Sequence, residues 1–123
     1  MSQKAIKITG WTLTALLAFL IAMSAFMKLI LDETAVAQAA AVGLDASTYR
    51  IIGIIEIVSL LLFIIPRTGV VGTLLLVAYL GGAIVTHLEH QQPIAMAVGV
   101  QTVLWITAFI RFPELKHRLI PAS

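Results

Sequence analysis

The chain has 123 residues, a net charge of +2 and no cysteine, and 60% of its residues are hydrophobic while only 11% are charged. So few charges cannot keep this much apolar surface in solution, which excludes a water-soluble globular protein and indicates a lipid environment. The absence of cysteine excludes disulfides, thiolate metal sites and dithiol redox chemistry. The basic residues flank apolar segments, where they suit lipid headgroups, so we expect no nucleic-acid partner.

Four apolar segments follow one another along the chain, at about 9–31, 49–65, 69–88 and 94–112. A helix needs roughly 20 residues to cross the bilayer core, and these runs lack the alternation of a barrel strand. The first run is too long for a signal peptide and three similar runs follow it, so we interpret it as a retained helix. The predicted fold is all-α, an integral membrane up-and-down four-helix transmembrane bundle that forms one domain over residues 1–123.

Charged and turn-forming residues mark the connections between these segments. The two later connections are short, which predicts antiparallel neighbouring helices. The alanine-rich stretch 33–42 predicts a short extra helix in the first outer loop, ending at Gly43 in a left-handed cap, although a bare spacer is an alternative. Asp45 or Ser47 is expected to cap the helix that follows.

Lysine and arginine are distributed unevenly between the two sides of the predicted bundle. One side carries Arg50, with Lys28 near it, and the other carries Lys4, Lys7, Arg67, Arg111, Lys116 and Arg118. The positive-inside rule places the richer side in the cytoplasm. We therefore expect a multi-pass protein of the bacterial cytoplasmic (inner) membrane, with both termini cytoplasmic and an interfacial tail from residue 111 to residue 123.

Two charged residues lie inside the predicted membrane segments, where each costs roughly 2.5 to 3.5 kcal/mol unless it has a partner or a purpose. Lys28 is near the outer end of the first segment and Glu56 is in the outer half of the second, so we expect an ion pair. Ser24 lies one turn from Lys28, and this small polar neighbour supports the pairing, although such spacing by itself indicates a helix interface. The alternative is that Lys28 extends to the membrane surface and that Glu56 is protonated.

Polar and aromatic residues of the last two segments lie at similar depths. Tyr79, Ala83 and His87 follow at four-residue steps. A single histidine at a helix end is more often a hydrogen-bonding residue than a metal ligand, so no metal is expected. Gln101 and Trp105 are one turn apart. Gln101 is equally expected to bond to a neighbouring helix or to contact a ligand. The candidate pocket residues are thus Lys28, Glu56, His87, Gln101, Tyr79, Trp105 and Ser24, and the first four are expected to converge.

Small residues also form a stripe along the third segment, at Ala78, Gly82 and Thr86. Small side chains allow close contact between transmembrane helices. We therefore expect this stripe to pack against the fourth segment.

The run Gly53-Ile-Ile-Glu56, the turn at Pro66 and above all the run Ala78-Tyr-Leu-Gly-Gly-Ala-Ile-Val-Thr-His-Leu88 resemble the DoxX-like family of small membrane proteins. The resemblance extends through Lys28 and Leu29 to Trp105, Arg111 and Pro113. Two positions depart from the family pattern: Ala25 replaces a glycine, and Glu89 replaces a residue that is commonly basic.

The resemblance implies a four-helix membrane bundle, with Lys28, Glu56 and His87 as family positions that have no assigned catalytic role. Family members are linked to thiosulfate and quinone redox complexes, to oxidative-stress complexes and to the assembly of other membrane proteins. We expect an accessory component, without a covalent cofactor, that presents an outer-half polar pocket to a membrane-protein partner or to a hydrophobic small molecule such as a quinone or lipid.

Two further functions stay open. One is the membrane subunit of a quinone-linked oxidoreductase, with quinone held against Tyr79, Trp105 and His87. The other is a small proton-coupled exporter, formed as a homo-oligomer of two chains, with Glu56 as the coupling residue.

Overall fold

The computed structural model describes residues 2–120, and these residues contain helices and no strand. The helices in chain order are α1 (Gln3–Ile30), α2 (Glu33–Ala41), α3 (Ala46–Ile64), the 3₁₀ turn η1 (Pro66–Thr68), α4 (Gly69–Glu89), α5 (Ala95–Arg111) and α6 (Pro113–Leu119). Met1 and residues 121–123, which the predicted domain and tail include, lie outside the described residues.

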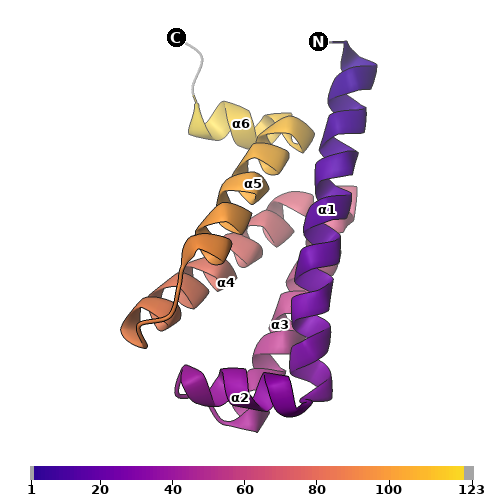
Figure 1. Cartoon of the computed structure of the whole chain (residues 1–123). Coiled ribbons are helices and arrows are strands. Elements are labelled where there is room, and N and C mark those ends of the chain that lie inside the picture. Colours follow the sequence, from indigo (N-terminus) through magenta and orange to yellow (C-terminus); the bar gives the residue numbers. More distant parts are fainter. Residues whose placement is uncertain (1, 121–123) are drawn as a thin grey trace.

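The four long helices form an up-and-down ring. Helix α1 packs against α3 and α5, and α4 packs against the same two helices from the other side. Helix α2 crosses one end of the ring, and α6 lies across the other end, where α1 begins and α5 ends (Figure 1). We call these the α2 end and the α6 end.

The described helices are long and apolar enough to cross a membrane three times, in α1, α3 and η1 with α4. Helix α5 makes a fourth span when it is taken with α6, which bends away from it by 110°. Large apolar side chains such as Phe19 and Val58 are exposed around the ring, as a lipid-facing surface requires. The predicted all-α membrane bundle is confirmed, and the chain is a multi-pass membrane protein.

Side-chain caps fix where the helices begin. The carboxylate of Asp32 accepts a hydrogen bond from the amide of Ala35 at 2.8 Å and starts α2, so the predicted extra helix is confirmed. Gly43 ends that stretch with a φ of 73°, a left-handed conformation that glycine adopts easily. Asp45, rather than Ser47, caps α3, and hydrogen bonds from Thr48 and Ser47 hold the pKa of its carboxyl below the usual value.

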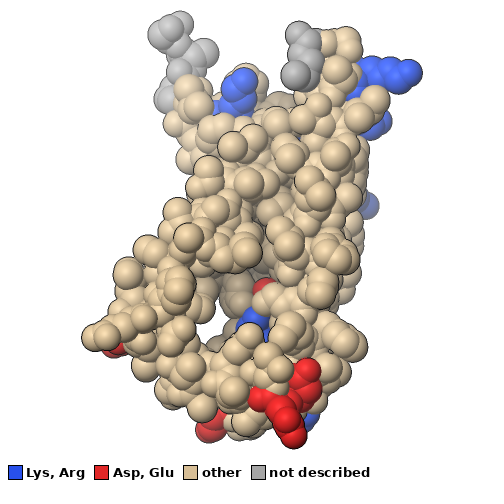
Figure 2. Space-filling view, in the orientation of Figure 1, with Lys and Arg blue, Asp and Glu red and all other residues tan. Residues whose placement is uncertain are grey.

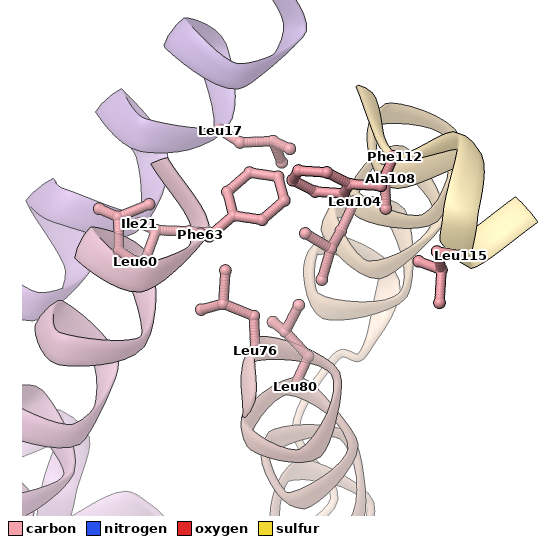
Figure 3. Packing of buried hydrophobic residues seen from close by; sticks show 10 residues of the cluster. All are labelled: Leu17, Ile21, Leu60, Phe63, Leu76, Leu80, Leu104, Ala108, Phe112 and Leu115. Atoms are coloured by element: carbon pink, nitrogen blue, oxygen red, sulfur yellow. The ribbon is translucent and has the colours of Figure 1, made fainter. Parts of the chain in front are cut away.

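The apolar core occupies the middle of the bundle and its α6 half. Each long helix contributes one or two turns to it, and Phe63 meets Phe112 edge to face at a centroid distance of 6.2 Å. Figure 3 shows the side chains pointing toward one another between the helices: Leu17, Ile21, Leu60, Phe63, Leu76, Leu80, Leu104, Ala108, Phe112 and Leu115. No comparable apolar cluster fills the α2 half of the described bundle.

Glycines show where the helices touch most closely. A Cβ added to Gly72 would lie 2.1 Å from the backbone nitrogen of Phe63, so α3 and α4 meet backbone to backbone near the α6 end. A Cβ added to Gly82 would meet nothing within 4 Å. The predicted packing of the Ala78–Gly82 stripe against the fourth segment is therefore wrong: Ala78 and Gly82 are exposed, because α4 turns the face with Gly72, Leu76 and Leu80 inward.

Arg111 closes the α6 end. Its guanidinium donates to the carbonyl oxygens of Phe63 at 2.9 Å and Ile64 at 3.0 Å, in the last turn of α3. It also donates to Thr14 at 3.3 Å and lies 4.4 Å from the ring centre of Trp11. The C-terminal carbonyls of a helix lack partners within the helix, so Arg111 satisfies them and ties α5 to α3 and α1.

Candidate functional site

A buried ion pair lies in the α2 half of the bundle. The Nζ atom of Lys28 on α1 is 3.0 Å from Oε1 of Glu56 on α3, and the two side chains are 9% and 2% exposed. Lys28 continues the inward face of α1 that contains Ile21 and Ala25, while Glu56 continues the inward face of α3 that ends at Phe63. Helical periodicity thus brings both charges inside the ring, and the predicted ion pair is present.

Ser24 completes the network around the pair. Its hydroxyl accepts a hydrogen bond from Lys28 at 2.5 Å and donates one to Glu56 Oε1 at 3.3 Å. Gly53 makes room for this contact, because an added Cβ would lie 2.8 Å from Lys28 Cβ and 3.2 Å from the carbonyl oxygen of Ala25. A small residue on α3 is therefore what allows α1 and α3 to approach at the level of the charges.

Two tyrosines surround the ammonium group of Lys28. Its Nζ atom is 5.9 Å from the ring centre of Tyr79 on α4 and 5.4 Å from that of Tyr49 on α3, within the range of cation–π attraction. The Tyr49 hydroxyl also donates to Gln38 of α2 at 3.3 Å. Our sequence reasoning missed Tyr49, although it lies seven residues before Glu56, and two helical turns place the two residues on one face.

The pair is neutral as a unit, which decides what it can do in a low-dielectric setting. Desolvating two opposite charges is tolerated when they touch and are hydrogen-bonded, whereas removing one partner leaves an isolated charge. Both hydrogen bonds that reach Glu56 from Lys28 and Ser24 end on Oε1. The Tyr79 hydroxyl is a further hydrogen-bonding neighbour of this carboxylate, so Oε2 is the atom that Tyr79 or a ligand's donor can engage.

Gln101 presents another acceptor to the inside of the bundle. It lies on the inward face of α5, three and seven residues before the buried Leu104 and Ala108. Its Oε1 atom is buried and accepts no hydrogen bond among the described residues. An unsatisfied buried acceptor costs roughly 1 to 3 kcal/mol, so this oxygen marks a place where a ligand's donor is stabilised.

His87 and Trp105 are placed differently from the pair. The Nδ1 atom of His87 is 2.6 Å from the carbonyl oxygen of Ala83 in its own helix, and the described residues provide no hydrogen bond from His87 to Lys28, Glu56 or Gln101. Trp105 packs edge to face on Phe109, with ring centres 6.1 Å apart, beside the apolar core. The structure thus joins Ser24, Lys28, Glu56 and Tyr79, and leaves His87 and Trp105 in local contacts.

A groove lies on the side of the bundle. It has a volume of about 370 Å³ and runs between α1 and α5, where apolar side chains line it. Figure 2 shows a hollow nearer the α2 end, between α1 on one side and the ends of α4 and α5 on the other, with basic and acidic atoms inside it. Lys28 and Glu56 are the charged residues that are buried in the part of the chain that the structure describes.

The described residues contain no group of three or more histidine, aspartate or glutamate side chains that could hold a metal ion. A family model described as the DoxX-like family matches residues 12–110, most of the sequence. The chain belongs to the DoxX-like family. The match covers all the site residues of this DoxX-like protein and ends before α6. No curated protein and no solved structure matches the chain.

Proposed function

We propose that this DoxX-like protein is an accessory membrane component that binds one hydrophobic small molecule in the outer half of the bilayer, without catalysing a reaction on its own. The observation that carries the proposal is the buried network of Lys28, Glu56 and Ser24 inside a hollow that no apolar core fills. Charged residues persist inside a membrane protein where they serve a purpose. The α2 end is the outer one, because basic residues concentrate at the α6 end.

The available atoms define the ligand's head. Oε2 of Glu56 and Oε1 of Gln101 are both able to accept hydrogen bonds, so a head that carries donors suits them. Tyrosine rings and the apolar groove suit the rest of a hydrophobic molecule. A protein partner that recognised these polar groups would need them on the surface, whereas they lie inside the ring.

The same two acceptors favour one more specific function, the membrane subunit of a quinone-linked oxidoreductase. A quinol carries two hydroxyl donors on a flat ring, which matches two acceptor oxygens flanked by aromatic side chains. The exporter has less support, because Glu56 already has Lys28 as its counter-charge and Ser24 as a donor. An acid that couples transport to proton movement needs to lose and regain its proton in each cycle.

The test is native mass spectrometry of the protein released from its own membranes, followed by extraction and identification of bound molecules. The wild-type chain should carry one hydrophobic molecule, and the double variant Lys28→Met, Glu56→Leu should lose it at least tenfold. The double variant removes both charges together, so it avoids the isolated buried charge of either single change. A quinol among the extracted molecules would favour the oxidoreductase subunit.

The matched control makes the same two substitutions in exposed residues of α6, Lys116→Met with Glu114→Leu, and should leave binding unchanged. Helical content and the melting temperature show whether each variant is folded. If the charge-free variant does not fold, Ser24→Ala with Gln101→Leu keeps the ion pair and alters the same site. Equal occupancy in the wild-type chain and in the folded site variants contradicts the proposal, as does a co-purifying protein in place of a small molecule.

A further inference from the structure

An apolar groove runs along the side of the bundle between α1 and α5. Leu16 and Leu20 of α1 form one wall, and Met96, Gly99 and Val103 of α5 form the other. The side chains of Leu16, Leu20 and Met96 are 58%, 45% and 73% exposed. The groove is therefore open to the lipid around the bundle, and the buried Leu17 is also part of its lining.

The α1 wall of the groove continues into the polar network. Leu16, Leu20, Ser24 and Lys28 follow at four-residue steps, and such residues are neighbours on a helix surface. Leu20 is the last residue of α1 that lines the groove, and Ser24, one turn farther along, bonds to Lys28 and Glu56. Apolar and polar side chains thus follow one another along α1, on a line that turns from the lipid-facing Leu16 to the buried Lys28.

We propose that this groove holds the hydrocarbon tail of an uncharged, hydroxyl-bearing, single-chain lipid, which enters sideways from the bilayer and places its head against Glu56 and Gln101. The inference rests on the proposed function and adds to it the class of ligand and the route of entry. The groove binds the tail, and the polar network selects the head.

The head is uncharged because the site already balances its own charge. Lys28 and Glu56 neutralise each other at 3.0 Å, and a charged head would add a third charge without a partner in a low-dielectric setting. The head carries hydroxyl groups because Gln101 Oε1 has no donor among the described residues, and Glu56 Oε2 accepts none from Lys28 or Ser24. A zwitterionic or anionic headgroup fails the first condition, because it brings formal charges into this setting even where it carries a hydroxyl group.

The tail is a single chain because of the size of the groove. Its volume of about 370 Å³ is near the lower limit of ligand pockets. Its α5 wall extends from Ala95 to Val103, a distance of ~12 Å at the rise of a helix. Such a space suits one chain lying along the helices, with the rest of a longer chain still in the bilayer.

Gly99 provides a way to close the groove without disturbing the protein. A Cβ added there would meet nothing within 4 Å, so a larger side chain at this position extends into the groove. Gly82 on α4 is the matched control, since it is also an exposed helical glycine, with no atom within 4 Å of an added Cβ, and it does not line the groove. Both glycine replacements raise helix propensity to the same extent.

The experiment places the purified chain in phosphatidylcholine nanodiscs that contain a few per cent of 1-monooleoylglycerol, and measures retained lipid by native mass spectrometry. Lysophosphatidylcholine with the same oleoyl chain serves as the charged-head comparison. We expect the wild-type chain and Gly82→Leu to retain monooleoylglycerol at least tenfold better than lysophosphatidylcholine. Gly99→Leu should retain at least fivefold less monooleoylglycerol at an unchanged melting temperature, and Ala95→Leu, at a second lining position, is the substitute if Gly99→Leu does not fold.

Each other result overturns a defined part of the inference. Equal retention by Gly99→Leu and the wild-type chain overturns the groove as the tail site, and equal retention of the two lipids overturns the uncharged head. Loss of native ligand in the Lys28→Met, Glu56→Leu variant, together with full monooleoylglycerol retention by Gly99→Leu, overturns this inference while the proposed function stands. Retention of neither lipid by the wild-type chain overturns the ligand class.

Discussion

Two cations inside the bundle, the buried Lys28 and the half-buried Arg111, hold it together in different ways. Lys28 is a compact charge that meets a carboxylate and a hydroxyl between α1 and α3. Arg111 instead directs its planar guanidinium at two carbonyl oxygens of α3, and the described residues give it no carboxylate partner. A guanidinium donates several hydrogen bonds in fixed directions, which an ammonium group cannot reproduce. Lysine therefore suits the site and arginine suits the closure of the α6 end.

Replacing Arg111 by lysine should destabilise the bundle although the charge is kept. A lysine ammonium cannot reproduce the two directed bonds of the guanidinium, so at least one of the hydrogen bonds to the carbonyl oxygens of Phe63 and Ile64 is lost. A hydrogen bond from a charged donor contributes roughly 1.5 to 3 kcal/mol. We expect a loss of about 2 kcal/mol in the free energy of unfolding, measured in detergent by denaturant titration. Arg118→Lys, on the exposed face of α6, is the control and should change nothing; equal stability of both variants would show that Arg111 bonds only loosely.

The glycines at the two ends of α4 have different surroundings, one at a helix contact and one in open space. Near the α6 end, Gly72 allows the backbones of α3 and α4 to touch, whereas Gly82 faces outward with open space beside it. The same contrast holds on the neighbouring helices, where Gly53 contacts Lys28 and Gly99 faces the groove. The helices are therefore close together around the core and farther apart around the hollow (Figure 1).

Adding one methyl group should test this contrast. In Gly72→Ala the new Cβ would overlap the backbone of Phe63, and overpacking of this kind costs roughly 1 to 3 kcal/mol. In Gly82→Ala the new Cβ meets nothing, and the gain in helix propensity should stabilise the protein by up to about 1 kcal/mol. Thermal unfolding in the same detergent would compare the two variants. A lower melting temperature for Gly82→Ala than for the wild-type chain would indicate that the stripe of Ala78, Gly82 and Thr86 does pack against another helix.

Charge is distributed unevenly between the two ends of the protein. In Figure 2 basic atoms gather at the α6 end and acidic atoms at the α2 end. The acidic residues near the α2 end include Asp32, Glu33 and Asp45, which begin or precede α2 and α3. This distribution leads to our proposal that the α6 end lies in the cytoplasm.

Accessibility of single cysteines should decide the orientation, because the natural chain has none that would interfere. We expect Gln38→Cys in α2 and Gln91→Cys beyond α4 to react with a membrane-impermeant maleimide in intact cells. His117→Cys in α6 should react only after the membrane is opened. All three residues are exposed in the structure, so low reactivity would report the side of the membrane rather than burial. The reverse pattern would invert the orientation and place the polar network in the inner half.

The amino-acid sequence by itself determined the approximate bounds and the up-and-down order of the four long helices and the presence of α2, whereas α6 was predicted only as part of an interfacial tail. Hydrophobic length, Asp45 before α3 and Gly43 after α2 are local signals, and the structure agrees with them because lipid obliges each helix to satisfy its own backbone. The meeting of Lys28 and Glu56 was also accessible, since a charge inside a membrane needs a partner and few residues were available.

Only the tertiary structure decided which face of each helix turns inward. Nearly every face of α4 is apolar or small, so periodicity could not separate the buried Gly72 from the exposed Gly82. The same limit hid the roles of Tyr49, Arg111 and the groove beside Gly99, which depend on the rotation and spacing of neighbouring helices. In lipid the hydrophobic effect does not determine how each helix is rotated about its axis. Packing contacts and polar bonds between helices determine it, and these form only once the helices have come together.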